Sequence, residues 1–179
     1  FQNIVLTEKF YPNKVDIYSL NNKHKICDLD ISAFNDVEAK YTTLQRFTLI
    51  NFLKDRLSSN SINYNKKIIK VNHLSKNIKI IFEDNSSIQC DYLVISDGVF
   101  SKTKSLIANK KIRPKYFNSI ALRATINQSN LQGVDPNNIS LSLGSNLHSV
   151  TYPINNNGLV NFISIMRKNL SPEDIANYS

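Results

Sequence analysis

The sequence lacks the features of disulfide-rich, metal-binding and membrane-spanning proteins. It has no tryptophan and only four glycines, and its two cysteines, Cys27 and Cys90, form neither a CxxC pair nor a zinc-ligand spacing. The three histidines are equally scattered, so no metal site is predicted. No apolar run approaches the roughly 18–20 residues of a membrane-spanning helix, and the first residues lack the pattern of a signal peptide. We therefore expect a cytoplasmic protein with reduced thiols.

Charge and composition say little about a partner. The 179 residues include 22 lysines and arginines against 14 aspartates and glutamates, which gives a net charge of +8, and 41% of the residues are hydrophobic. This positive charge suits an anionic cofactor or a membrane surface. No basic stripe with interleaved aromatic residues indicates nucleic acid, so we expect no nucleic-acid partner. The chain is long enough for one domain or two small lobes. Because it begins at Phe1 without a methionine, we expect a fragment.

Hydrophobic periodicity predicts a fold that mixes helices and strands. Apolar residues recur at helical spacing from Thr43, which predicts a helix that Thr42 or Thr43 caps and that ends near Ser58. Short helices are also predicted after Ser101 and after Ser171. The predicted strands are residues 13–20, 26–32, 67–74, 77–84, 87–96, 119–127, 139–145, 147–154 and 159–168. The third, fourth and fifth of these strands are joined by short turns and form a predicted β-meander.

The stretch CDYLVISDGVFSKTK, residues 90–104, raises the question of a binding site. Its run from Tyr92 to Ile95 is apolar on both faces, which predicts a central, covered strand. The strand stops at Asp97 and Gly98, and the end of such a strand is where open α/β sheets bind ligands. A glycine permits close approach of a ligand, and the N–H groups of a following helix favour an anion. The alternative is a plain strand-turn-helix in which Asp97 is a turn or capping residue.

Three stretches together indicate a family. YTTLQRFTLINFLKDRL has an arginine ahead of an apolar helix, CDYLVISDGVFSKTKSLI contains the Asp-Gly corner, and YPINNNGLVNFISIM is a strand pair joined by a turn. In this order they resemble the middle of the class A flavoprotein monooxygenases, which are aromatic-ring and ubiquinone-biosynthesis hydroxylases, and the ubiquinone type fits best. The resemblance spans residues 14–168. The family's N-terminal GxGxxG loop is absent here, and Lys104 stands where the family usually has arginine. The resemblance therefore implies a middle fragment that lacks the N-terminal dinucleotide-binding loop.

The resemblance also implies a fold and a set of site residues. The implied fold is α+β, with part of a flavin-binding lobe joined to a mostly antiparallel substrate-domain sheet. The implied division is residues 1–42 as the first part of that sheet, 43–118 as part of the FAD-binding lobe, and 119–179 as the remaining, truncated sheet. The implied cofactor-binding residues are Arg46, Gln45, Val71, Asp97 and Gly98, and the implied substrate-pocket residues are Tyr152 and Pro153. No catalytic triad is expected, because in such enzymes the cofactor carries the chemistry.

The expected function is that of an FAD- and NAD(P)H-dependent monooxygenase that hydroxylates a small aromatic or quinone-type substrate, such as a quinone-biosynthesis precursor. We expect this fragment alone to be inactive. A lipid-tailed precursor would imply peripheral contact with the inner membrane, with which the positive charge is compatible. Two alternatives remain open: a non-enzymatic α+β binding module, and a different FAD-dependent oxidoreductase of the same broad fold.

Overall fold

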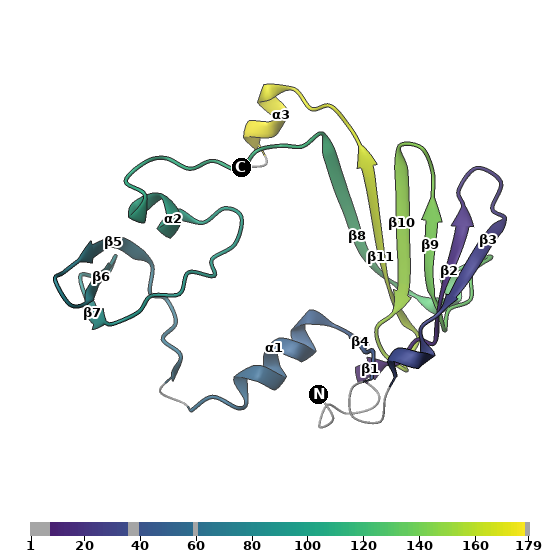
Figure 1. The fold of residues 1–179 in the computed structure, drawn as a ribbon, viewed down its shortest axis with the longest axis horizontal. Coiled ribbons are helices and arrows are strands. Elements are labelled where there is room, and N and C mark those ends of the chain that lie inside the picture. Colours follow the sequence, from purple (N-terminus) through teal and green to yellow (C-terminus); the bar gives the residue numbers. More distant parts are fainter. Residues whose placement is uncertain (1–7, 36–39, 59–60, 178–179) are drawn as a thin grey trace. The chain divides into compact units, whose positions relative to one another are not determined.

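The structure, a computed structural model, describes residues 8–35, 40–58 and 61–177. The chain divides into two compact units, which are described separately below and are both drawn in Figure 1. The first unit comprises Phe1–Leu57 and Asn118–Asn169, and the second comprises Ser58–Phe117 and Leu170–Ser179. Within the described residues, no helix is long and apolar enough to cross a bilayer.

The first unit is built on a six-stranded sheet with the strand order β3-β2-β9-β10-β11-β8 (Figure 1). Neighbouring strands are antiparallel except for β2 and β9, which are parallel. The strands are β2 (Lys14–Ser19), β3 (Lys25–Asp30), β8 (Ser119–Asn127), β9 (Ile139–Leu143), β10 (Leu147–Pro153) and β11 (Leu159–Arg167). All six lie where the alternation of the sequence predicts strands, and the predicted α+β fold is confirmed.

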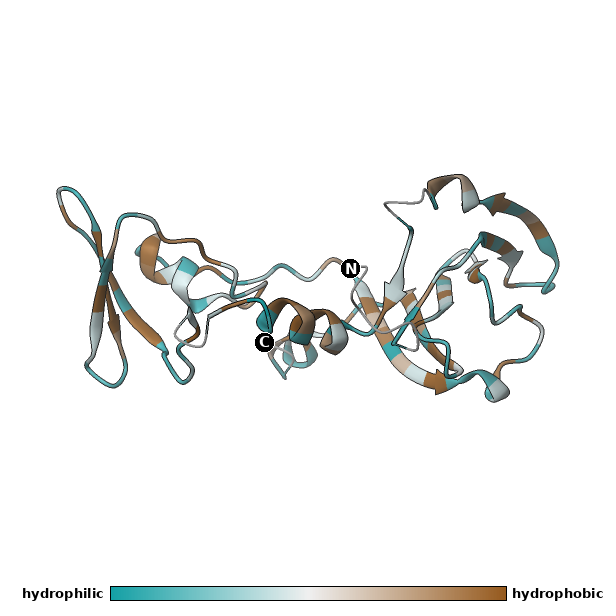
Figure 2. Cartoon of the chain, turned by 90° about the horizontal axis from the view of Figure 1, so that it is seen from below, coloured by the Kyte–Doolittle hydropathy of each residue, from teal (hydrophilic) through white to brown (hydrophobic). Residues whose placement is uncertain are grey.

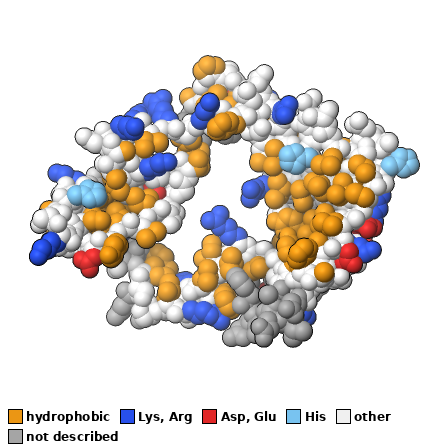
Figure 3. Space-filling model, in the orientation of Figure 1, with side chains coloured by type: hydrophobic (Ala, Val, Ile, Leu, Met, Phe, Trp, Pro, Cys, Tyr) orange, Lys and Arg blue, Asp and Glu red, His pale blue; other side chains and the backbone are white. Residues whose placement is uncertain are grey.

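The register of the sheet decides which side chains share a face. Tyr152 of β10 is paired with Asn161 of β11, and Asn161 is paired with Thr125 of β8. Directly paired residues point to the same side of a sheet, as do residues two apart on one strand. Arg123 therefore shares the face of Thr125. Hydrophobic and hydrophilic residues alternate along these strands (Figure 2), and hydrophobic side chains cover much of the sheet on the side seen in Figure 3.

The buried carboxylate of Asp16 joins β2 both to its neighbour β3 and to a segment that is distant in sequence. Asp16 of β2 is only 2% exposed. Lys25 Nζ of β3 lies 2.7 Å from Asp16 Oδ1, which has no other partner among the described residues. Asn138 Nδ2, just before β9, donates to Asp16 Oδ2 at 2.9 Å. Because a buried charge must be compensated, these contacts fix β2, β3 and the start of β9 to one another.

The helix predicted from Thr43 begins three residues later, at α1 (Arg46–Lys54), so its predicted start and caps are wrong. Thr43 instead lies in the short strand β4 (Thr43–Leu44), which pairs with β1 (Lys9–Phe10). The Thr43 hydroxyl, on a side chain that is almost fully buried, donates to the carbonyl of Pro153. These partners are distant in sequence, and they outweigh the local helical pattern.

The second unit contains the predicted β-meander. Its sheet has the order β5-β6-β7, with β5 (Ile68–His73), β6 (Ile78–Phe82) and β7 (Ser87–Cys90). Ile80 and Phe82 of β6 form its buried centre. The helix α2 (Lys102–Ile107) packs against β5, and α3 (Pro172–Asn177) ends the described chain. Both helices begin directly after the serines that the sequence indicates, and Ser101 and Ser171 accept hydrogen bonds from their first turns.

The prediction of a covered central strand before the Asp-Gly corner is wrong for the described structure. The strand β7 ends at Cys90, and no strand is formed at Tyr92–Ile95. Tyr92 is 89% exposed and Val94 is 85% exposed. A segment that is apolar on both faces is covered only between two layers, and no described residues supply those layers.

Candidate functional site

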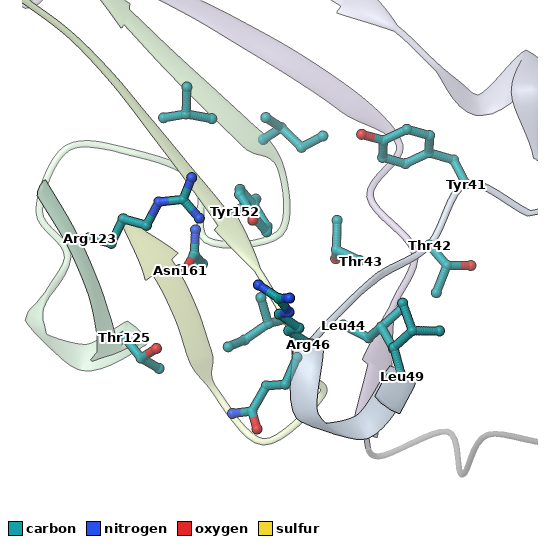
Figure 4. A pocket seen from close by; sticks show the side chains of 14 residues that line it. Tyr41, Thr42, Thr43, Leu44, Arg46, Leu49, Arg123, Thr125, Tyr152 and Asn161 are labelled. Atoms are coloured by element: carbon teal, nitrogen blue, oxygen red, sulfur yellow. The ribbon is translucent and has the colours of Figure 1, made fainter. Parts of the chain in front are cut away.

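A cavity of about 790 Å³ lies in the first unit, between one face of the six-stranded sheet and the segment that leads into α1 (Figure 4). This volume is typical of small-molecule and cofactor sites. The wall from the α1 side consists of residues 41–46 and Leu49. The sheet wall consists of Arg123, Thr125, Ile139, Val150, Tyr152, Ile154 and Asn161.

The pairing of β4 with β1 sets the position of the α1 wall. Thr43 is fixed by its backbone to Phe10 and by its hydroxyl to Pro153, at the end of β10. The next residues, Gln45 and Arg46, are thereby held at the edge of the cavity as α1 begins. Gln45 is the N-cap but makes no side-chain capping bond, so its carboxamide is available to a ligand.

The sheet wall presents polar groups in one row and apolar groups beside it. Tyr152, Asn161 and Thr125 form the row that the strand register sets. Asn161 Nδ2 is buried and has no hydrogen-bond partner among the described residues. Buried polar atoms in native proteins are nearly always paired. An acceptor is therefore missing here, and a bound molecule could supply it.

The cavity is positively charged. Its lining contains Arg46 and Arg123 but no aspartate or glutamate. Neither arginine makes an ion pair within the part of the chain that the structure describes. A guanidinium binds carboxylates and phosphates with two parallel hydrogen bonds, so the lining favours an anionic ligand.

Three of the residues predicted from the sequence meet at this cavity. Gln45 and Arg46 lie on one wall and Tyr152 lies on the other, although Tyr152 is far from both in sequence. Pro153 is buried at the end of β10 and contributes its carbonyl to the Thr43 contact. Its side chain is not part of the cavity lining.

The other predicted residues belong to the second unit. Val71 is half-buried on β5, where it pairs with Ile80. Asp97 accepts from the backbone N–H of Thr103 at 3.3 Å. The Ser101 hydroxyl, followed by the hydroxyl and backbone N–H of Thr103, lowers the pKa of Asp97. These bonds are also those of an ordinary turn ahead of a helix.

Gly98 was expected to permit close approach of a ligand, and its backbone conformation is one that favours glycine. Its φ is +82°, which side chains rarely adopt, and an added Cβ would meet no atom within 4 Å. The backbone at this corner is thus both left-handed and open to an approaching molecule.

Arg123 and Asn161 were not identified from the sequence. Both lie in segments that were correctly predicted as strands. Alternation along one strand shows which of its residues share a face. Only the pairing of β8 with β11 shows that Asn161 and Thr125 are neighbours. The lone arginine within the otherwise uncharged strand SIALRATIN was the available signal.

The chain has the fold of flavin-dependent aromatic hydroxylases. A solved structure of 2,6-dihydroxypyridine-3-hydroxylase from Arthrobacter nicotinovorans matches 96% of the chain and 44% of its own length, with a TM-score of 0.77 and 12% identity. Klebsiella pneumoniae HpxO, complexed with FAD and uric acid, matches 93% of the chain and 43% of its own length, with a TM-score of 0.74 and 13% identity.

The sequence comparison points to the same class of protein. Salicylate hydroxylase from Pseudomonas putida is 21% identical over 145 residues, which are 74% of this chain and 33% of the relative. No family model matches the chain. The resemblance to class A flavoprotein monooxygenases is confirmed by these similarities, whereas the ubiquinone type is not. The chain spans about a third of the length of the curated relatives that it matches.

Proposed function

We propose that this chain is part of an FAD- and NAD(P)H-dependent monooxygenase that hydroxylates an aromatic ring. The observation that carries the proposal is the meeting of Gln45, Arg46 and Tyr152 at one cavity in a hydroxylase fold. These residues come from two of the three stretches that suggested the family.

The cavity lining fits an anionic flavin dinucleotide. Arg46 lies at the cavity edge and makes no ion pair with any described residue, and the Gln45 carboxamide, which makes no capping bond, lies beside it. We assign Arg46 to a phosphate or to the ribityl chain, with Gln45 as an additional donor. From the second unit, we assign Asp97 and Gly98 to the pyrophosphate side and the backbone of Val71 to the adenine side. When bound, the flavin supplies the oxygen chemistry, and the chain's residues orient the cofactor and exclude water.

The substrate side of the cavity is assigned to the sheet wall. Tyr152 offers an aromatic face beside the apolar side chains of Val150 and Ile154. Pro153 contributes by holding the end of β10 in place through Thr43. The substrate is a small aromatic compound, and a quinone-biosynthesis precursor is one candidate. A cytoplasmic location, with peripheral contact at the inner membrane for a lipid-tailed precursor, completes the proposal.

A non-enzymatic binding module is the second candidate. The observation that favours it is the hydrogen bond from the Thr103 N–H to Asp97, together with the Ser101 cap of the helix that follows, which an ordinary turn would also have. The two candidate functions predict different results when FAD is added. Only the hydroxylase predicts that FAD binding affects both the Asp97 corner and the α1 wall.

The test is a titration of the chain with FAD, followed by backbone amide shifts in NMR spectra, which detect weak binding. We expect shifts at Gln45 and Arg46 and at Asp97 and Gly98 together. Arg46→Met should weaken binding about 10- to 100-fold, since hydrogen bonds to charged groups contribute about 1.5–3 kcal/mol.

Arg56→Met is the matched control for Arg46→Met. Arg56 follows α1, donates to the carbonyl of Phe52 at 2.8 Å and stacks on the Phe52 ring at 3.4 Å. It does not line the cavity, yet its loss removes the same charge. An equal loss of affinity in both variants would indicate non-specific attraction. Shifts at only one of the two predicted regions would contradict a shared flavin site.

A further inference from the structure

We propose that α2 and the segments on either side of it form a surface that docks on anionic phospholipid membranes. This surface, called the basic surface below, comprises residues 99–115 of the second unit. The inference names the residues and the lipids of the peripheral contact, and it rests on the proposed function only for the reason why the protein would approach a bilayer. The docking itself requires no bound flavin.

The basic surface carries positive charge without an acidic residue. Six of the 14 residues from 102 to 115 are lysine or arginine, and none is aspartate or glutamate. All six are exposed, and none makes an ion pair with a described residue. They are Lys102, Lys104, Lys110, Lys111, Arg113 and Lys115. Clusters of about four to eight basic residues are typical of surfaces that bind anionic lipid head groups.

Two hydrogen bonds hold the later part of the basic surface against α2. The Ser105 hydroxyl accepts from the backbone N–H of Ile112 at 3.0 Å, and the Ser105 carbonyl accepts from the N–H of Lys110 at 3.3 Å. Thr103 is the buried residue of α2, and Ser105 lies about 200° further round the helix. Lys110 and Lys111 are therefore held on the side of α2 that faces away from Thr103. Figure 3 shows Lys and Arg side chains gathered among hydrophobic ones in this region.

Exposed apolar side chains accompany these charges. Val99 is 73% exposed and Phe100 is 59% exposed, directly before the helix, and Leu106 and Ile107 are exposed within it. Apolar side chains that enter the head-group region add to the attraction between basic residues and anionic lipids. A nucleic acid would attract the same cations, but it has no apolar layer for the aliphatic side chains. The combination therefore favours a membrane.

The test is cosedimentation of the chain with phospholipid vesicles in the absence of FAD. We expect binding to vesicles of equal parts phosphatidylcholine and phosphatidylglycerol, and none to phosphatidylcholine alone. A basic residue near an anionic surface contributes about fivefold to the partition coefficient, so replacing both Lys110 and Lys111 with glutamine should lower it about 25-fold. Phe100→Ser should lower it about 10-fold, because the ring no longer enters the lipid.

The matched control replaces both Lys76 and Lys79 with glutamine. These lysines belong to the β5–β6 hairpin of the same unit, lie outside the basic surface and make no ion pair with a described residue. Their loss removes the same charge, and we expect this variant to retain most of the vesicle binding. Circular dichroism of each variant checks that the fold is kept.

Three results would each overturn the inference. They are equal binding to neutral and anionic vesicles, equal losses in the two double variants, and an unchanged vesicle affinity in Phe100→Ser together with tighter binding to a single-stranded oligonucleotide. The last result would indicate a nucleic-acid surface instead. Because vesicle binding is measured without FAD, a failure of FAD to bind would overturn the proposed function and not the membrane surface.

Discussion

Replacing Thr43 with valine tests whether one buried hydroxyl holds the α1 wall of the cavity. Valine has almost the same shape, so the change removes the donor without creating a cavity. The hydroxyl donates to Pro153 and lies 3.5 Å from the carbonyl of Phe10. Leaving a buried acceptor unpaired costs about 1–3 kcal/mol. For a chain of this size, we expect the melting temperature to fall by roughly 2–12 °C.

The matched control is Thr43→Ser, which keeps the hydroxyl and removes one methyl group, at a cost of about 0.8 kcal/mol. Urea and thermal unfolding of both variants, followed by circular dichroism, give the free energies of unfolding. Hydrogen exchange at residues 41–46 should also be faster in Thr43→Val. The reasoning is refuted if Thr43→Val is as stable as the wild type, or if Thr43→Ser is the less stable variant.

Two further predictions concern the second unit. The pKa of Asp84 is lowered to about 2, first by its hydrogen bond to Lys66 and then by Ser86. Its ionised form therefore stabilises the unit above about pH 4, and this contribution is lost as the pH falls toward 2. Asp84→Asn can retain the acceptor for the Ser86 N–H, so it should destabilise the unit at pH 7 but not at pH 2; a pH-independent difference in urea unfolding would contradict this. Gly98→Ala should cost roughly 1–2 kcal/mol, because φ is +82° and alanine disfavours that region. Gly98→Asn should cost less, and equal melting temperatures for Gly98→Ala and the wild type would refute the argument.

The strands of the six-stranded and three-stranded sheets could be predicted because alternation is a local property. The predicted strand 119–127 coincides with β8, and β5, β6 and β10 lie within the ranges predicted for them. The helix start could not be predicted, because it depends on Phe10 and Pro153, which are distant from Thr43 in sequence. The apolar run from Tyr92 to Ile95 has the composition of a strand between two layers, but composition does not show whether other segments supply those layers, and Tyr92 and Val94 are exposed.

Only part of the candidate site could be predicted from the sequence. Arg46 and Tyr152 were identified by family resemblance, and the structure places both on one cavity. Arg123 and Asn161 required knowledge of which strands pair and in which register. The unpaired Nδ2 atom of Asn161 depends on the packing of atoms around it, about which a sequence pattern contains no information.

The parallel pairing of β2 with β9 has a consequence for synthesis on the ribosome. The β2–β3 hairpin emerges early, but Val15 pairs with Ile139, which is made only after the whole meander and α2. Until then, the edge of β2 that β9 will occupy remains unpaired. The pairing of β2 with β9 must bring together two segments that are distant in sequence. The meander, whose pairings are all local, can fold first. Ribosome stalling before β9 should therefore leave β2 and β3 accessible to chaperones or to a neighbouring nascent chain.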